Sequence, residues 1–354
     1  MSASSSVGWS RPEGILTLPR LPPVLVRNLP WMVLILLSIT FAEFLTGSTF
    51  VLLPLLNPIG GVFLVGLYGA GVLLVREASV RWAKGWPTIL LLGVAYGIAE
   101  EGLGTKTFFG PIGVGTLGVY GHWAGVNWVW ATELALFHAI FSIALPIAVV
   151  GILFPATRGR SFLPTGRALG GVLAVFLATV GAMFVLFNRS EIPSPALILA
   201  SLGAIAALIA LARVVPSSLD RLGLRPARSA PRAGPFVLGA AFVWGFFAPA
   251  WIGPALVPVP ALIVAAIVAW TVLFGVELAR HRELWQAPSA QIDFVLGSLT
   301  FSLVLASVYT LFGDFGAPVA VAAVVLVGWR VHRKLARPTV APAGWPVPRP
   351  GLVP

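Results

Sequence analysis

The sequence predicts an all-α fold, a polytopic transmembrane helix bundle of about ten spans with both termini in the cytoplasm. Composition is the first observation behind this prediction. Of 354 residues, 58% are hydrophobic and only 10% are charged, and the mean hydropathy is +0.95. A soluble domain carries about 25% charged residues. The lipid bilayer is therefore the expected partner, and the net charge of +11 does not indicate nucleic acid binding.

The lengths of the apolar segments are the second observation. A helix needs about 20 apolar residues to cross the hydrocarbon core of a bilayer. Segments of about this length, separated by polar residues, proline or glycine, predict ten helices. They cover residues 29–47, 58–77, 86–105, 127–154, 168–188, 195–214, 234–253, 258–278, 290–312 and 316–332.

The positions of the basic residues are the third observation, and they test the number of spans. With ten spans and a cytoplasmic N-terminus, 21 of the 23 lysines and arginines fall on the cytoplasmic side. The exceptions are Lys106 and Arg189. This bias is the one that membrane proteins show, and omitting one helix would destroy it.

The chain divides into four regions on this basis. Residues 1–28 form a polar cytoplasmic leader, residues 29–188 hold the first five helices, residues 189–332 hold the last five, and residues 333–354 form a proline-rich cytoplasmic tail. We expect a multi-pass protein of a prokaryotic cytoplasmic membrane. The chain has no cysteine, which excludes disulfides, thiolate metal sites and a cysteine nucleophile.

Five ionisable side chains interrupt the apolar segments of the first half. A charged residue at the centre of a membrane helix costs about 2.5–3.5 kcal/mol on insertion scales, so such residues point to a functional site. Counting helical rise from the cytoplasmic ends places all of them toward the outer side. They are Glu43, Glu100, Glu101, Glu133 and His138.

The adjacent pair Glu100 and Glu101 is the sharpest of these features. Two close carboxylates in a low dielectric do not both ionise readily, and a carboxyl group that keeps its proton to neutral pH suits general acid–base catalysis. Because adjacent residues of an α-helix point about 100° apart, we expect only one of them to face a given site. Tyr96, one turn earlier, is expected to hydrogen-bond Glu100, and Lys106 to offset the charge from the outer rim.

His138 is the predicted partner of the pair, with Ser142 one turn further along the same helix face. A histidine inside a membrane helix is as often a structural hydrogen-bonding group as a functional one. The sequence assigns no metal or cofactor. A zinc site of two histidines and one glutamate would need His122, from the outer loop, as its second histidine.

Residues 106–126 contain six glycines and several aromatic residues. The segment is either a lid or re-entrant loop over an outward-facing cavity, or an ordinary glycine-rich connection.

The stretch Tyr96-Gly-Ile-Ala-Glu100-Glu101, with Phe137-His138 on the next helix, resembles the CAAX-protease and bacteriocin-processing (CPBP) family of glutamate-dependent intramembrane proteases. That family combines EExxxR with FxxxH and HxxxN motifs. The resemblance implies that Glu100 and Glu101 activate water, with His138 as their partner and Asn188 as a remnant of the third motif. Three motif positions differ, since Thr105, Leu134 and Phe184 replace the expected Arg, Phe and His.

Three functions remain open from the sequence. An intramembrane hydrolase, acting on a membrane-embedded peptide, explains the glutamate pair and His138. A proton- or cation-coupled transporter would use Glu43 and Glu133 as well, to relay protons or to bind a small solute or ion. A non-enzymatic membrane subunit would use the polar residues only to hold helices together, although interhelical hydrogen bonds contribute too little to favour this.

Overall fold

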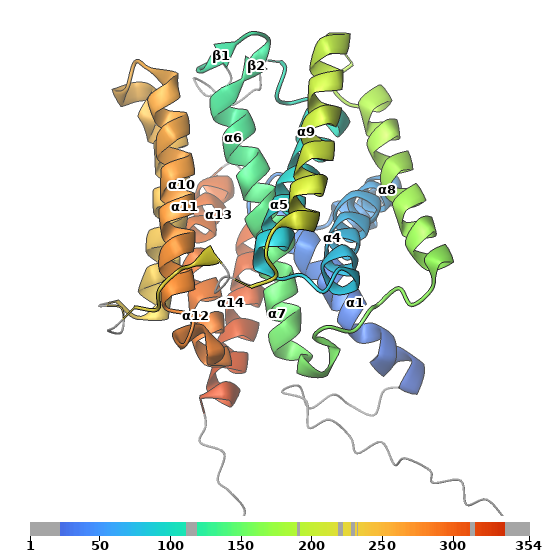
Figure 1. Cartoon of the computed structure of the whole chain (residues 1–354), viewed down its shortest axis with the longest axis vertical. Coiled ribbons are helices and arrows are strands. Elements are labelled where there is room, and N and C mark those ends of the chain that lie inside the picture. Colours follow the sequence, from blue (N-terminus) through green and yellow to red (C-terminus); the bar gives the residue numbers. More distant parts are fainter. Residues whose placement is uncertain are drawn as a thin grey trace, which may run out of the picture.

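The computed structural model describes residues 22–110, 119–189, 192–218, 222–227, 231, 233–311 and 316–336. Long helices run side by side along the longest axis of the molecule, and one short β-hairpin lies at the upper end (Figure 1). The predicted helical membrane architecture is confirmed. Eight helices of the described residues are long and apolar enough to cross a membrane.

The first half of the chain contains more helical segments than predicted spans, because several spans change their helix type midway. Its elements are α1 (Pro23–Ile39), η1 (Thr40–Phe44), α2 (Leu53–Leu56), α3 (Pro58–Leu64), η2 (Val65–Gly69), α4 (Ala70–Arg81), α5 (Trp86–Gly97), η3 (Ile98–Gly104), β1 (His122–Trp123), β2 (Val126–Asn127), α6 (Trp128–Phe137), η5 (His138–Ala144), α7 (Leu145–Leu153), η6 (Pro155–Thr157) and α8 (Gly166–Leu186).

The second half consists of longer and more regular helices. They are α9 (Pro195–Val214), α10 (Pro235–Leu256), α11 (Pro260–Arg280), η8 (Leu284–Gln286), α12 (Pro288–Ser298), α13 (Thr300–Leu311) and α14 (Gly316–Leu335).

All ten predicted spans coincide with helical segments, but two of them are not among the eight apolar helices. One is α5 with η3, which carries the glutamate pair, and the other is α14, which ends in His332, Arg333 and Lys334. The first turns of α1 and the last turns of α14 lie at the same end of the bundle (Figure 1), as an even number of crossings requires. The count of ten and the cytoplasmic side of that end stay predictions.

One predicted boundary was wrong. α1 begins at Pro23, inside the predicted leader, because proline is well suited to the first turn of a helix. The predicted span 290–312 coincides with the apolar helix Pro288–Leu311, which is interrupted at Leu299 between α12 and α13. Residues 1–21 of the leader and 337–354 of the tail lie outside the described residues.

Close packing between α5 and the α6–η5 helix positions the polar residues. A Cβ atom on Gly93 would lie 2.7 Å from Cα of Ala139, and one on Gly97 would lie 2.9 Å from Cα of Ala135. Small residues spaced four apart let membrane helices approach each other in this way. The approach brings η3, which follows α5, beside the start of η5.

An aromatic core joins the two halves of the bundle. Phe137 and Phe141 of the first half lie 6.1 Å and 6.0 Å from the ring of Phe247 on α10. That ring stacks on Phe301 of α13 at 4.1 Å. α8, α9 and α11 have few buried residues, so their apolar surfaces are left to face lipid.

Candidate functional site

Four π-helical segments, one in each of four membrane helices, carry five polar residues that lie close together. Glu43 lies in η1, Tyr68 in η2, the pair Glu100 and Glu101 in η3, and His138 in η5. π-helical turns are rare in proteins and occur frequently at functional sites. Their convergence marks this region of the bundle as the candidate site.

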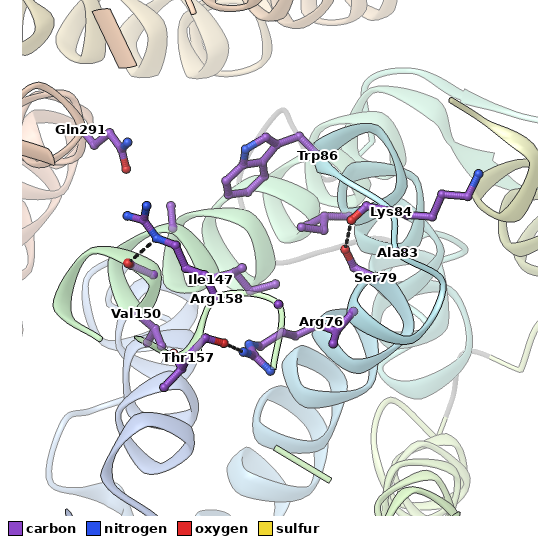
Figure 2. Close-up of a pocket in the computed structure, with 15 residues that line it drawn as sticks. Arg76, Ser79, Ala83, Lys84, Trp86, Ile147, Val150, Thr157, Arg158 and Gln291 are labelled. Atoms are coloured by element: carbon purple, nitrogen blue, oxygen red, sulfur yellow. Dashed lines mark hydrogen bonds between the residues drawn. The ribbon is translucent and has the colours of Figure 1, made fainter. Parts of the chain in front are cut away.

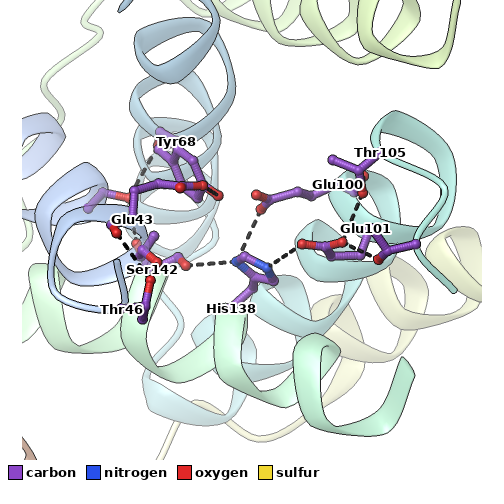
Figure 3. Close-up of polar contacts among 11 residues, drawn as sticks. Glu43, Thr46, Tyr68, Glu100, Glu101, Thr105, His138 and Ser142 are labelled. Carbon is purple, nitrogen blue, oxygen red and sulfur yellow. Dashed lines mark hydrogen bonds and ion pairs between the residues drawn. The ribbon is translucent and has the colours of Figure 1, made fainter. Parts of the chain in front are cut away.

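The imidazole of His138 lies between the two adjacent glutamates (Figure 3). Its Nδ1 is 3.1 Å from Oε2 of Glu100, and its Nε2 is 3.1 Å from Oε1 of Glu101. The expectation that only one of the two glutamates faces the site was therefore wrong. A π-helix has more residues per turn than an α-helix, so adjacent side chains diverge less and both carboxylates reach the same imidazole.

Two threonine hydroxyl groups hold the second oxygen of Glu101. Thr105 donates to Oε2 at 2.8 Å, and Thr107 donates to the same oxygen. Between them the chain turns sharply at Lys106, whose φ of +62° is in the left-handed region. This turn brings Thr107 back to the carboxylate, so the residues that end η3 also fix the orientation of Glu101.

Glu100 and Tyr96 keep polar atoms without a hydrogen bond. Oε2 of Glu100 and the hydroxyl of Tyr96 are buried, and neither has a hydrogen-bond partner among the described residues. The Tyr96 hydroxyl lies near the Glu100 carboxylate, and its ring packs on His138 with centroids 6.0 Å apart. Tyr96 thus belongs to the site as expected, and its hydroxyl interacts with the Glu100 carboxylate without the geometry of a regular hydrogen bond.

Glu43 joins the site through a tyrosine on a neighbouring helix. Its Oε1 accepts a hydrogen bond from the hydroxyl of Tyr68, and its Oε2 accepts one from Thr49 at 2.5 Å. The Tyr68 hydroxyl also lies beside the Glu100 carboxylate. A continuous row of polar groups therefore runs from Thr49 to Glu101, with His138 within it (Figure 3).

Serines on two helices fix the position of His138. Nδ1 of His138 lies 2.9 Å from the hydroxyl of Ser142, one turn later on the same helix face as predicted. Ser38 of α1 donates to the backbone oxygen of Ser142 at 2.6 Å. These contacts fix the ring orientation, and they leave Nε2 directed at Glu101.

Lys106 and Asn188 lie next to the site and bind backbone oxygens. The buried ammonium of Lys106 donates to the carbonyl oxygen of Phe184 at 2.7 Å. The side-chain amide of Asn188 donates to the carbonyl oxygen of Thr105 at 2.6 Å. Both residues tie the end of α8 to the chain that follows η3.

His122 and Glu133 were predicted as supporting residues, and the structure places neither beside His138. His122 is exposed on β1, so it does not supply the second histidine of a zinc site. Glu133 is buried, but its Oε1 accepts a hydrogen bond from the indole of Trp251 on α10 at 2.9 Å. Of the loop 106–126, residues 111–118 lie outside the described residues, so the re-entrant segment stays a prediction.

Sequence reasoning missed Tyr68, Thr49, Thr107 and Glu77. Tyrosine and threonine are common in apolar helices and loops, so neither gives a signal before the helices are placed. Glu77 lies four residues before Arg81 and next to Arg76, and such pairs usually mark the solvated end of a helix. It is nonetheless fully buried, at the end of the bundle that holds these arginines.

A cavity of about 480 Å³ lies apart from the candidate site, among α4, α5, α7 and α12. Arg76 and Arg158 line it, but both guanidinium groups bind backbone carbonyl oxygens (Figure 2). Its lysine, Lys84, donates to the carbonyl oxygen of Val215 at 2.6 Å. These cations are used to fix the chain around the cavity.

The glutamate–histidine cluster combines deep burial with several ionisable groups. Glu100, Glu101 and His138 have relative exposures of 1%, 9% and 3%. One donor atom from each lies within 4.8 Å of one from each of the others, a spacing that suits proton exchange or a shared cation. Such an arrangement is expensive to desolvate, so cohesion between helices is a poor explanation for it.

Comparisons with known proteins agree with the membrane architecture. No curated protein and no solved structure matches the chain. One family model matches residues 32–344, which include all of the site residues named above. With its bundle of apolar helices and its buried polar cluster, the chain belongs to an uncharacterized membrane protein family.

Proposed function

We propose that the protein is an intramembrane hydrolase that uses Glu100, Glu101 and His138 as its acid–base group. The observation that carries this proposal is the position of His138 between two carboxylates, with the buried hydroxyl of Tyr96 beside the Glu100 carboxylate. A hydrolytic site needs such an acceptor for the proton of water and such a donor for the developing oxyanion.

Each residue has a distinct role in this mechanism. Glu100 takes a proton from water as the water oxygen attacks the carbonyl carbon of the peptide, and this proton goes to the leaving amine nitrogen when the C–N bond breaks. Oε2 of Glu100 lies 3.1 Å from Nδ1 of His138, so the imidazole can share this proton. His138 exchanges that proton with Glu101, whose position Thr105 and Thr107 fix. The Tyr96 hydroxyl donates to the oxyanion. The substrate class is a membrane-embedded peptide, which the resemblance to glutamate-dependent intramembrane proteases supports.

A proton- or cation-coupled carrier is the second candidate, and one observation favours it. The row Glu43, Tyr68, Glu100, His138 and Glu101 links four helices through groups that can pass a proton. Chains of ionisable residues in membrane proteins mark proton relays and ion pathways. A hydrolase does not need Glu43, whereas a relay does.

Reconstituted vesicles distinguish the two functions. The full chain is placed in liposomes with transmembrane peptides that carry a quenched fluorophore, and a pH-sensitive dye is enclosed inside. We expect peptide cleavage that Glu100→Gln lowers at least about 100-fold, the contribution typical of a general base. Glu133→Gln is the matched control, because its carboxylate is equally buried but binds Trp251 instead.

The enclosed dye reports proton flux, which is the result expected of a carrier. Proton flux that Glu100→Gln and Glu43→Gln both abolish, without peptide cleavage, would replace the hydrolase with the carrier. Cleavage that survives Glu100→Gln would assign the reaction to other residues and overturn the proposed mechanism.

A further inference from the structure

Glu100, Glu101 and His138 have the ligand types of a zinc site and lie close to one another. Zinc binds imidazole nitrogen and carboxylate oxygen at about 2.0–2.2 Å, so two ligand atoms at the corners of a tetrahedron lie roughly 3.3 Å apart. Oε1 of Glu101 lies 3.1 Å from Nε2 of His138, which matches this spacing. Oε2 of Glu100 lies 3.1 Å from the other ring nitrogen, Nδ1, so the Glu100 side chain must rotate to reach an ion on Nε2, and one donor atom of each residue already lies within 4.8 Å of the others. The imidazole nitrogen favours zinc over magnesium or calcium, which prefer oxygen ligands alone.

The hydrogen bonds around the cluster leave one donor atom of His138 and one of Glu101 available to an ion. Ser142 contacts Nδ1 of His138, which leaves Nε2 to bind a metal. Thr105 and Thr107 hold Oε2 of Glu101, which leaves Oε1. Known metal ligands are oriented in the same way, each by a hydrogen bond to its other polar atom.

An independent observation also points to a ligand at this place. The hydroxyl of Tyr96 is buried, has no hydrogen-bond partner among the described residues and lies beside the Glu100 carboxylate. Tyr96 has a relative exposure of 4%. A buried hydroxyl without a partner is destabilising, and a metal-bound water or hydroxide would satisfy it.

Charge balance favours the same conclusion. Glu43, Glu100 and Glu101 contribute three carboxylates to one buried network, His138 contributes at most one positive charge, and the buried ammonium of Lys106 next to the site contributes one more. Buried carboxylates are stable in a low dielectric when they are protonated, paired with cations or bound to a metal. A divalent cation would offset the remaining charge at a single point.

We propose that Glu100, Glu101 and His138 bind one zinc ion, with Tyr96 hydrogen-bonded to the water that completes its coordination. This deepens the proposed hydrolase and rests on it, because a bound zinc ion would lower the pKa of its water and so supply the nucleophile. In the zinc-bound protein Glu100 and His138 would hold the ion instead of passing the proton of water. Zinc binding is nevertheless a separate property, and its test does not depend on a substrate.

The first measurement is the zinc content of the purified full chain after equilibration with buffered zinc ions and gel filtration, by inductively coupled plasma mass spectrometry. We expect about one zinc ion per chain, and none in His138→Gln or in the double variant Glu100→Gln, Glu101→Gln. Glu133→Gln is the matched control and should keep its zinc. Thermal unfolding in the same buffers shows whether each variant is folded.

Thr107 supplies a finer test. Thr107→Val removes the hydroxyl that holds Glu101 and should weaken zinc affinity about 10-fold or more, as loss of such supporting groups does elsewhere. Thr107→Ser keeps the hydroxyl and should restore the affinity. A reduction common to both variants would show that the hydroxyl does not orient a metal ligand, which contradicts the proposal.

The outcomes separate zinc binding from hydrolysis. Zinc that remains in folded His138→Gln protein is bound elsewhere, and this result overturns the site. Folded wild-type protein that holds no zinc after the equilibration also overturns it, and the hydrolase stands if this protein cleaves the peptide. Stoichiometric zinc in wild type, lost in the site variants, supports the site even where no peptide is cleaved and the hydrolase proposal fails.

Discussion

Glu77 shows how a single buried carboxylate organises the end of the bundle opposite the hairpin. It is fully buried, and it accepts hydrogen bonds from Arg76 at 3.2 Å and from the backbone N–H of Phe162 at 2.6 Å. The hydroxyl of Ser161 donates to its other oxygen at 2.5 Å. One side chain thus holds Arg76 of α4 together with Ser161 and Phe162 of the connection to α8.

Replacing Glu77 should therefore destabilise the protein strongly. Glu77→Ala removes the carboxylate that pairs with Nη1 of Arg76 and accepts from the backbone N–H of Phe162, and breaking a buried ion pair in this way costs about 3–5 kcal/mol. Thermal unfolding of the purified chain in detergent measures the loss. The control is Glu277→Ala on the surface of α11, where the ion pair with Arg280 is half exposed and the change should be within about 0.5 kcal/mol. Equal shifts in the two variants would contradict the prediction.

At the scale of the element, the glycines of α5 determine how closely the glutamates approach the histidine. In an ordinary helix, alanine in place of glycine is stabilising, because glycine loses more backbone entropy on folding. At Gly97 the sign should reverse, since a Cβ atom would lie 2.9 Å from Cα of Ala135 and 3.0 Å from its carbonyl oxygen. Neither backbone atom can move without displacing the α6–η5 helix.

Two matched glycine variants test this. Gly97→Ala should lower the free energy of unfolding by about 1–3 kcal/mol, the usual effect of overpacking, and should reduce zinc affinity and any catalysis. Gly181→Ala, on the lipid-facing helix α8 with no atom within 4 Å, should be neutral or stabilising. Unfolding in detergent and zinc titration measure both effects. A Gly97→Ala protein as stable as Gly181→Ala would show that α5 and α6 have room to separate.

The sequence allows the long helices to be predicted, and it does not allow their internal changes to be predicted. A backbone in hydrocarbon must satisfy its own hydrogen bonds, so every apolar segment of sufficient length becomes a helix, as all ten predicted segments do. The π-helical turns depend on packing against neighbouring helices. No local sequence pattern predicts that residues 98–104 form a π-helix while residues 86–97 form an α-helix. The sequence predicts that Glu100, Glu101 and His138 lie close together. It does not predict that both glutamates contact one imidazole, because this contact depends on the π-helical segment η3.

At the scale of the whole molecule, the two halves are joined by one aromatic core and by polar contacts from α10 and its C-terminal end. Trp251 donates to Glu133, and Tyr120 near the hairpin donates to the carbonyl oxygen of Val257 at 2.7 Å. The hairpin and η6 lie at opposite ends of the bundle (Figure 1). The side of the membrane on which each lies is predicted from the distribution of basic residues and can be measured directly.

The chain has no cysteine, so a thiol-reactive label can react only with a cysteine that has been introduced. We expect Trp123→Cys, on the exposed strand β1, to react with a membrane-impermeant maleimide in intact cells. Ala156→Cys, exposed in η6, should react only after the membrane is permeabilised. The reverse pattern would place the N-terminus outside and would contradict the predicted topology.

α8 gives the bilayer a mechanical connection to the buried cluster. Most of its surface faces lipid, yet its C-terminal end is fastened to the site through Lys106 on the Phe184 carbonyl and Asn188 on the Thr105 carbonyl. A helix in contact with lipid tilts to match the thickness of the membrane around it. Tilting of α8 would pull on the peptide that carries Thr105 and Thr107, and hence on the carboxylate of Glu101. The thickness of the membrane would thereby affect the position of the Glu101 carboxylate, and with it the chemistry of the buried cluster.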